Sequence, residues 1–226
     1  MEVFHRGGVD LLFWECKIKK MAKKFIILTI VILILVGGGI FLWQEIRETP
    51  MEKWEEAKVS PVEDYVIIEE TPEGKIVENK KTKLTYKIPK DWITKKDNFA
   101  SFYTPNAEFS EIRSDVLLKG CQIEVLGSAI KTNLATLEEY MNKNFQKWSP
   151  VIMVDEFQRI KINNYSALKY KYHVKQDTPD RIKMAYISID IPSEKYLYKI
   201  LLATPLQETE RCEEEFNKFL EIVSIF

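Results

Sequence analysis

Alternating apolar and polar residues predict a series of β-strands in the last two thirds of the chain. The alternating or aromatic runs fall at residues 84–88, 99–104, 121–125, 160–162, 168–174, 182–191 and 196–203. Short connections join most consecutive runs, and short connections favour antiparallel pairing. The pattern therefore predicts a mainly antiparallel sheet of six to seven strands.

Two stretches follow a helical period instead. One apolar face is formed by Leu137, Tyr140, Met141, Phe145 and Trp148. A second apolar stripe is formed by Leu206, Cys212, Phe216, Phe219, Leu220 and Val223. Residues 136–139 (TLEE) and 204–207 (TPLQ) are typical of capped helix starts, so they predict where the two helices begin.

The strands at 182–191 and 196–203 are read as apolar on both faces, so both faces of the sheet should be covered. Covering them with the two helices gives the expected fold class, α+β, as an α/β/α sandwich.

Residues 25–43 form an uncharged apolar run, FIILTIVILILVGGGIFLW, which ends in an aromatic residue typical of a membrane interface. As a helix, these 19 residues would extend about 28 Å. The hydrocarbon layer of a bilayer is about 30 Å thick. We therefore expect a single transmembrane helix. The alternative is a cleaved signal peptide, although the run is long for one and no small-residue cleavage site follows.

Basic residues before the apolar run predict its orientation. They are Lys17, Lys19, Lys20, Lys23 and Lys24. By the positive-inside rule, residues 1–24 face the cytoplasm and the rest of the chain lies outside, so the protein is a single-pass cell-membrane protein. Residues 1–20 fit no targeting pattern, so the natural chain is hypothesised to start at Met21; detection of peptides from residues 1–20 would contradict this.

The net charge of −1 conceals three unlike segments. Residues 1–43 carry a charge of +3, residues 44–80 carry −6, and residues 81–226 carry +2. The acidic segment contains three prolines and no sustained apolar period. We therefore expect an acidic linker at 44–81, followed by an extracytoplasmic domain at 82–226.

The same composition argues against several functions. A nearly neutral domain is unlike a dedicated nucleic-acid binder, which is usually basic. Phosphate-loop, nucleophile-elbow, HExxH and CxxC motifs do not occur in the sequence, so no catalytic residue, cofactor or metal is expected. His173 could be a general base or metal ligand, but Lys171 and Lys175 on either side disfavour both roles.

Cys121 and Cys212 would lie outside the cytoplasm, where a disulfide is permitted. They could pair if the C-terminal helix covers the third predicted strand. Two separate buried thiols remain the alternative.

A basic cluster is predicted around the hairpin at residues 168–191. It contains Lys169, Lys171, Lys175, Arg181 and Lys183. Such a cluster beside a membrane could contact anionic lipid headgroups or an acidic partner. A simple solvated face is the alternative.

Several packing and turn motifs resemble the PsbP-like family over residues 82–226. They are YKIPKDW (86–92), FASFYTP (99–105), LEEYMNKNF (137–145), VDEFQRIKINNYSALKYKY (154–172) and EEFNKFLEIVSIF (214–226). The same fold occurs in a small Ran-binding nuclear-import protein. Family members often carry a glycine in the hairpin where this sequence has Asn164. The resemblance implies a non-enzymatic accessory or binding domain. Photosynthetic members act at photosystem II, and nothing in this sequence points to that role.

Anchor and resemblance together predict a membrane-anchored module that binds a protein partner of unknown identity. The alternative is a small-ligand or lipid-binding domain with an aromatic pocket between sheet and helix. The domain contains 19 aromatic residues, which would suffice to line such a pocket.

Overall fold

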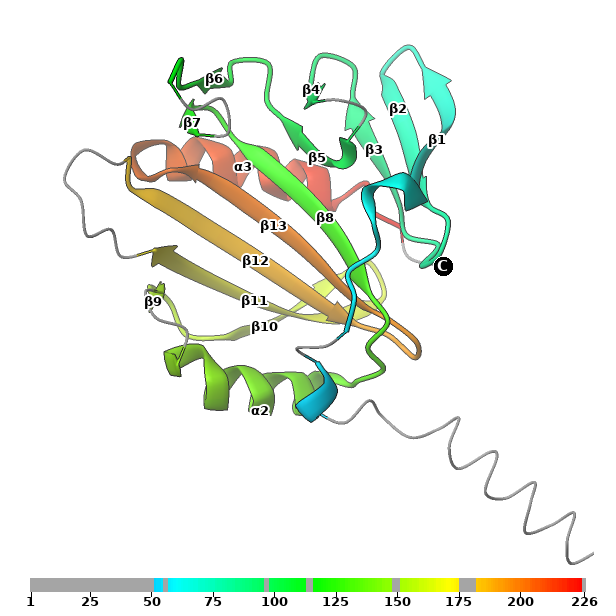
Figure 1. Ribbon diagram of the computed structural model, residues 1–226, viewed down its shortest axis with the longest axis vertical. Coiled ribbons are helices and arrows are strands. Elements are labelled where there is room, and N and C mark those ends of the chain that lie inside the picture. Colours follow the sequence, from blue (N-terminus) through cyan, green and yellow to red (C-terminus); the bar gives the residue numbers. More distant parts are fainter. Residues whose placement is uncertain are drawn as a thin grey trace, which may run out of the picture. The chain divides into compact units, whose positions relative to one another are not determined.

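A large antiparallel sheet lies at the centre of this computed structural model (Figure 1). The structure describes residues 51–54, 57–95, 98–112, 116–147, 151–174 and 182–224. The strands of the large sheet are β4 (Ile93–Lys95), β5 (Asn98–Tyr103), β8 (Gln122–Ser128), β9 (Val151–Met153), β10 (Gln158–Ile162), β11 (Tyr165–Val174), β12 (Met184–Pro192) and β13 (Leu197–Pro205). Their order is β10-β11-β12-β13-β8-β5-β4, and β9 also pairs with β11.

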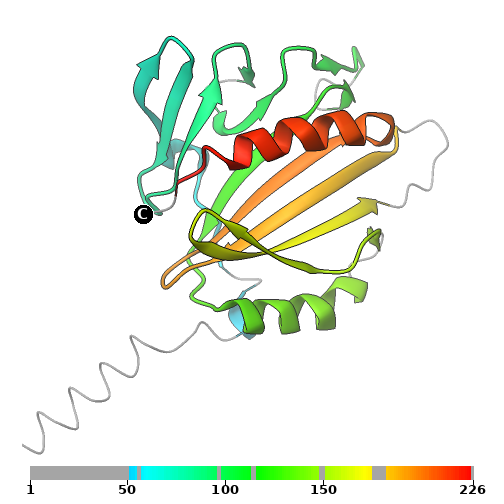
Figure 2. The same ribbon diagram turned by 180° about the vertical axis from the view of Figure 1, so that it is seen from behind.

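The helix α3 (Thr209–Leu220) lies across one face of this sheet, as Figure 2 shows. The buried side of α3 presents Cys212, Phe216 and Phe219 to a core of aliphatic residues. The sheet contributes Ile123, Val125, Ile187, Ile189, Ile200 and Leu202, all at most 1% exposed. These residues alternate along their strands, so the period-2 pattern brings them to one face.

The opposite face carries the helix α2 (Leu134–Asn144), followed by the 3-10 helix η3 (Phe145–Lys147). Leu137, Met141 and Phe145 pack there against Leu168 and Tyr170 of β11. In Figure 1, α2 lies along the β10–β11 side of the sheet rather than over its middle. Each face of the sheet therefore carries one helix, and the sheet-rich α+β class is confirmed.

Two smaller sheets complete the fold. One contains β1 (Tyr65–Thr71), β2 (Gly74–Asn79) and β3 (Thr85–Pro89), and the other contains β6 (Glu108–Phe109) and β7 (Leu117–Lys119). The remaining 3-10 helices are η1 (Met51–Lys53), η2 (Val62–Asp64) and η4 (Leu206–Glu208). The strand predicted at 84–88 thus belongs to a separate three-stranded sheet, whereas β4 and β9 enlarge the main sheet to eight strands.

The segment expected as an acidic linker differs most from its prediction. Its second half forms β1 and β2, and residues Glu48–Phe226 form one compact unit. Tyr65 is 3% exposed and Val77 is fully buried, so they join the same core as Tyr86. The acidic residues Glu69 and Glu70 are exposed, so the negative charge lies on the solvent side of an ordered hairpin.

Both predicted helix starts also need correction. The cap of helix α2 lies three residues earlier than predicted, at Asn133, whose side chain accepts a hydrogen bond from the Thr136 amide. Thr204 and Pro205 end β13, and α3 begins at Thr209 after η4. The Thr204 hydroxyl donates to the Gly120 carbonyl instead of capping a helix.

The predicted cytoplasmic segment (1–24) and transmembrane segment (25–43) lie outside the described residues. Within the described ranges, no helix has the length and apolar character needed to cross a membrane.

Candidate functional site

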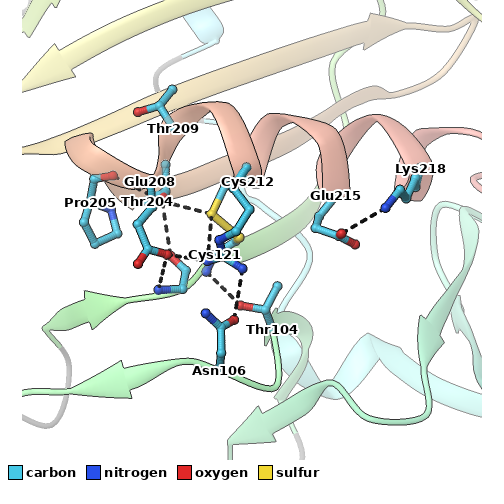
Figure 3. Close-up of a disulfide and its surroundings, with 12 residues drawn as sticks. Thr104, Asn106, Cys121, Thr204, Pro205, Glu208, Thr209, Cys212, Glu215 and Lys218 are labelled. Carbon is cyan, nitrogen blue, oxygen red and sulfur yellow. Dashed lines mark hydrogen bonds and ion pairs between the residues drawn. A yellow bond between two sulfur atoms is a disulfide. The ribbon is translucent and has the colours of Figure 1, made fainter.

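Cys121 and Cys212 form a disulfide between the start of β8 and the first turns of α3 (Figure 3). Their Cα atoms are 5.6 Å apart, and neither residue is exposed. The sequence left a disulfide and two separate thiols open, and the structure has the disulfide. The bond joins positions 91 residues apart, so it fixes α3 on the sheet.

Polar contacts hold the backbone around this disulfide. The Cys121 amide donates to the Thr104 hydroxyl over 2.9 Å, and the Thr104 amide donates to the Cys121 carbonyl over 3.0 Å. Gly120, at φ +91°, donates its amide to the Glu208 carboxylate over 3.0 Å. A Cβ on Gly120 would lie 2.8 Å from the Ala107 Cα atom, so this turn requires glycine.

Two members of the predicted basic cluster pair with a carboxylate on α3. Lys169 and Lys171 lie 2.8 and 2.9 Å from the two carboxylate oxygens of Glu213. Burial acts to raise the pKa of Glu213, but the two ammonium groups outweigh it and lower that pKa. Glu213 of α3 thus pairs with Lys169 and Lys171, and a contact of the basic cluster with an anionic surface stays a prediction.

The structure describes one of the other three members of the cluster. Lys183 is exposed, whereas Lys175 and Arg181 lie outside the described residues. His173 lines a cavity of about 490 Å³ together with Lys171, Asp155 and Glu210. Among the described residues, no group of three or more His, Cys, Asp or Glu side chains could hold a metal ion.

An aromatic cavity of about 390 Å³ lies between α2 and the β9–β10 connection. Phe145, Phe157 and Met153 supply its apolar wall, and the rest of the lining is Glu138, Asn142 and Glu156. The Phe145 and Phe157 rings meet edge to face at 5.7 Å between centroids. Half of the lining residues are polar, and the aromatic ligand pocket expected between sheet and helix stays a prediction.

A buried polar cluster lies under α2, where sequence reasoning expected an apolar surface. Asp190 of β12 is 2% exposed, and its carboxylate accepts hydrogen bonds from the Tyr170 hydroxyl at 3.0 Å and the Ser188 hydroxyl at 3.2 Å. Lys199 of β13 donates to the Tyr170 hydroxyl over 3.2 Å and lies 3.7 Å from Asp190. The missed signal is the alternation of Tyr186, Ser188 and Asp190 along a strand whose other face is aliphatic.

The electrostatics of this cluster keep Tyr170 and Lys199 protonated. Burial raises the pKa of the Tyr170 hydroxyl, and the Asp190 carboxylate raises it further. Burial acts to lower the pKa of Lys199, but Asp190 and Tyr170 outweigh it and raise that pKa. Neither group is therefore prepared to act as a base or nucleophile near neutral pH.

Beyond α2, the same side of the sheet is only partly covered. We call this surface the open face, and it consists of Ser101 on β5, Gln122 and Glu124 on β8, Leu201 and Ala203 on β13, and Tyr172 and Tyr186 on β11 and β12. Strand register places Ser101, Glu124, Leu201 and Ser188 in one row, and Gln122, Ala203, Tyr186 and Tyr172 in the next. Along β8, half-buried Gln122 and Glu124 alternate with fully buried Ile123 and Val125.

Polar contacts on the open face are few. The Gln122 amide donates to the Ser101 hydroxyl over 3.0 Å and to a Glu124 carboxylate oxygen over 2.6 Å. Tyr172 and Tyr186 stack with ring centroids 5.0 Å apart and planes 9° apart. Burial raises the pKa of Glu124, and it raises the pKa of Tyr172 to about 12. The open face therefore combines a carboxylate, a hydrogen-bonding amide and two stacked rings.

Comparisons with known proteins give structural likenesses at low sequence identity. No family model matches the chain, and no curated protein matches it. LpqN of Mycobacterium tuberculosis, described as involved in cell envelope biogenesis, aligns with a TM-score of 0.44 and 12% identity over 63% of this chain and 82% of that chain. A Pseudomonas aeruginosa protein of unknown function aligns with a TM-score of 0.41 and 14% identity over 61% and 88%.

PsbP (CyanoP) of Synechocystis aligns with a TM-score of 0.41 and 13% identity over 66% of this chain and 90% of that chain. All these TM-scores lie below 0.5, so no property of these proteins is carried over to this chain.

Proposed function

We propose that this protein is a single-pass membrane protein whose domain lies outside the cytoplasm and acts as a non-catalytic, PsbP-like binding module for a protein partner. The observation that carries the binding role is the open face. One side of the sheet is sealed by α3, whereas the other leaves half-buried polar and aromatic residues beyond α2. Surfaces of this composition, rich in tyrosine, are typical of protein contacts.

Two further observations support the location and the absence of catalysis. The Cys121–Cys212 disulfide suits an oxidising compartment, which agrees with an apolar anchor preceded by lysines. The buried Tyr170 and the partly exposed Lys199 stay protonated near neutral pH, which supports a packing role for the polar cluster rather than proton transfer.

Affinity purification of the full-length chain from detergent-solubilised native membranes tests this proposal. The wild type is compared with Leu201→Asp, which changes the open face, and with Ile68→Asp, which changes a side chain 53% exposed on β1. We expect quantitative mass spectrometry to find the same partner with the wild type and with Ile68→Asp, and to lose it with Leu201→Asp. Recovery that is equal for all three proteins, or no partner at all, would contradict the proposal.

The aromatic cavity supports a second candidate, a binding site for a small apolar ligand or lipid. Its volume of about 390 Å³ lies within the usual range for ligand pockets, which is about 300–1,000 Å³. Native mass spectrometry of the protein purified from its own membranes should then show a bound small molecule. Phe157→Trp, which fills the cavity, should release it, and a ligand-free wild type would argue against this candidate.

A further inference from the structure

Glu124 has a half-buried carboxylate, and no cationic side chain of the described residues forms an ion pair with it. Among the described residues, its side chain accepts a hydrogen bond from Gln122 and forms no ion pair. Its neighbours across the sheet are Ser101 on one side and Leu201 on the other. A partly desolvated carboxylate is stabilised most by a positive charge placed within a few ångströms.

The lysine on the same side of the sheet does not fill this role. Lys199 lies one row away, opposite Leu126 and Asp190, and its ammonium group is engaged by Asp190 and Tyr170. A cation that pairs with Glu124 would therefore come from outside the described part of the chain.

The surroundings of Glu124 fit a long cationic side chain. Ala203 lies between Gln122 and Tyr186 in the register, so the position between β8 and β12 carries a short side chain, which is 6% exposed. Burial raises the pKa of the Tyr186 hydroxyl, and the negative charge of Glu124 raises it further, so the two side chains interact electrostatically. Stacked tyrosine rings offer electron-rich faces to a lysine or arginine.

We propose that the open face binds a lysine or arginine side chain of the protein partner, with Glu124 as the counter-charge and the Tyr172–Tyr186 pair as the aromatic wall. This inference rests on the binding role proposed above and names the chemistry of the partner. The alkyl stem of such a side chain would pack against Leu201 and Ala203, and its charged end would pair with Glu124. Arginine and tyrosine are also the residues most enriched at the centres of protein interfaces.

Site-specific photo-cross-linking in isolated native membranes tests the inference. A photoreactive phenylalanine analogue replaces Leu201 in the full-length chain, with or without Glu124→Gln, and the cross-linked partner peptide is sequenced by mass spectrometry. Glu69→Gln is the matched control, because Glu69 is exposed on β1 in the separate small sheet. We expect Glu124→Gln to lower the cross-link yield at least tenfold and Glu69→Gln to leave it unchanged.

The identity of the cross-linked peptide gives a second, independent readout. We expect a lysine or arginine within a few residues of the cross-linked position, and its replacement by glutamine should lower the yield as much as Glu124→Gln does. We also expect the wild-type yield to fall when salt is raised from 0.05 to 0.5 M, so the inference is tested even if Glu124→Gln unfolds.

The outcomes separate this inference from the proposal beneath it. If the cross-link to a protein persists in Glu124→Gln and its yield does not change with salt, the cationic contact is overturned but the binding role stands. Competition by free spermidine at micromolar concentration overturns the assignment to a protein side chain. The absence of any protein cross-link from position 201 overturns both.

Discussion

Asp190 and Lys199 show what single residues contribute to this fold. Sequence reasoning read β12 and β13 as apolar on both faces, because most of their residues are aliphatic or aromatic. The structure instead places the two charges on the α2 side, where Asp190 accepts hydrogen bonds from Tyr170 and Ser188. Alternation could have assigned Ser188 and Asp190 to one face. It could not have shown that Lys199 would come from the next strand, because that depends on strand register.

Replacing Asp190 by alanine should lower the free energy of unfolding by about 2 kcal/mol, because it removes the counter-charge of Lys199 and two buried hydrogen bonds. The figure lies at the low end for a buried ion pair, since the Lys199 side chain is 35% exposed and can turn toward water. Urea denaturation at neutral pH measures the change. Glu69→Ala, on an exposed position, should change stability by less than about 0.5 kcal/mol, and an equal loss in both variants would contradict the role of the cluster.

At the scale of elements, α3 is attached to the sheet by three kinds of contact. Phe216 and Phe219 pack in the core, the disulfide fixes the first turns, and Glu213 holds two lysines of β11. The helical period predicted the apolar contact. It could not identify the ion pairs, because Lys169 and Lys171 alternate along a strand and resemble a solvated face until a helix covers them.

Breaking the disulfide should loosen α3 and lower stability by about 2–5 kcal/mol, because the bond closes a loop of about 90 residues. Equilibrium denaturation of the wild type with and without a thiol reductant measures this loss. The Cys121→Ala/Cys212→Ala double variant should unfold at the same denaturant concentration with or without reductant. A wild type that is equally stable in both conditions would show that packing alone holds the helix.

The Glu213 contact should make stability depend on pH. Its pKa in the folded state is lowered from 4.5, so its contribution is complete above that value and is lost as the pH falls through the lowered pKa. Glu213→Gln should therefore cost about 1–2 kcal/mol at pH 7. The difference in stability between the wild type and Glu213→Gln should shrink below pH 4.5. Thermal unfolding of both proteins across the acid range measures this difference. A gap that stays constant with pH would contradict the ion pairs.

At the scale of the whole molecule, the acidic segment contributes two strands to the folded domain. All of residues 44–81 were expected to be a linker, yet β1 and β2 pack on the domain core through Tyr65 and Val77. Its prolines and glutamates indicate exposure, but they do not exclude a hairpin with one buried side. The distinction depends on whether the rest of the domain offers an apolar surface, which local composition does not encode.

The proposed membrane orientation predicts which engineered cysteines can be labelled from outside the cell. In a Cys16→Ser background, Ile112→Cys should react with a membrane-impermeant maleimide in intact cells, since Ile112 is 95% exposed. Lys23→Cys should react only after the membrane is permeabilised. Labelling of both positions in intact cells would contradict a retained anchor with a cytoplasmic N-terminus.

The sequence by itself determined the elements whose signal is local. Period-2 alternation located the longer strands, the helical period located both helices, and short connections predicted antiparallel pairing. These features arise from backbone geometry and from burial of one face, which neighbouring residues encode together. The tertiary structure alone decided that Cys121 meets Cys212, that Glu213 pairs with Lys169 and Lys171, and that Lys199 pairs with Asp190. Each of these contacts joins residues that are not adjacent in the chain, and their distances depend on strand order, register and the placement of α3.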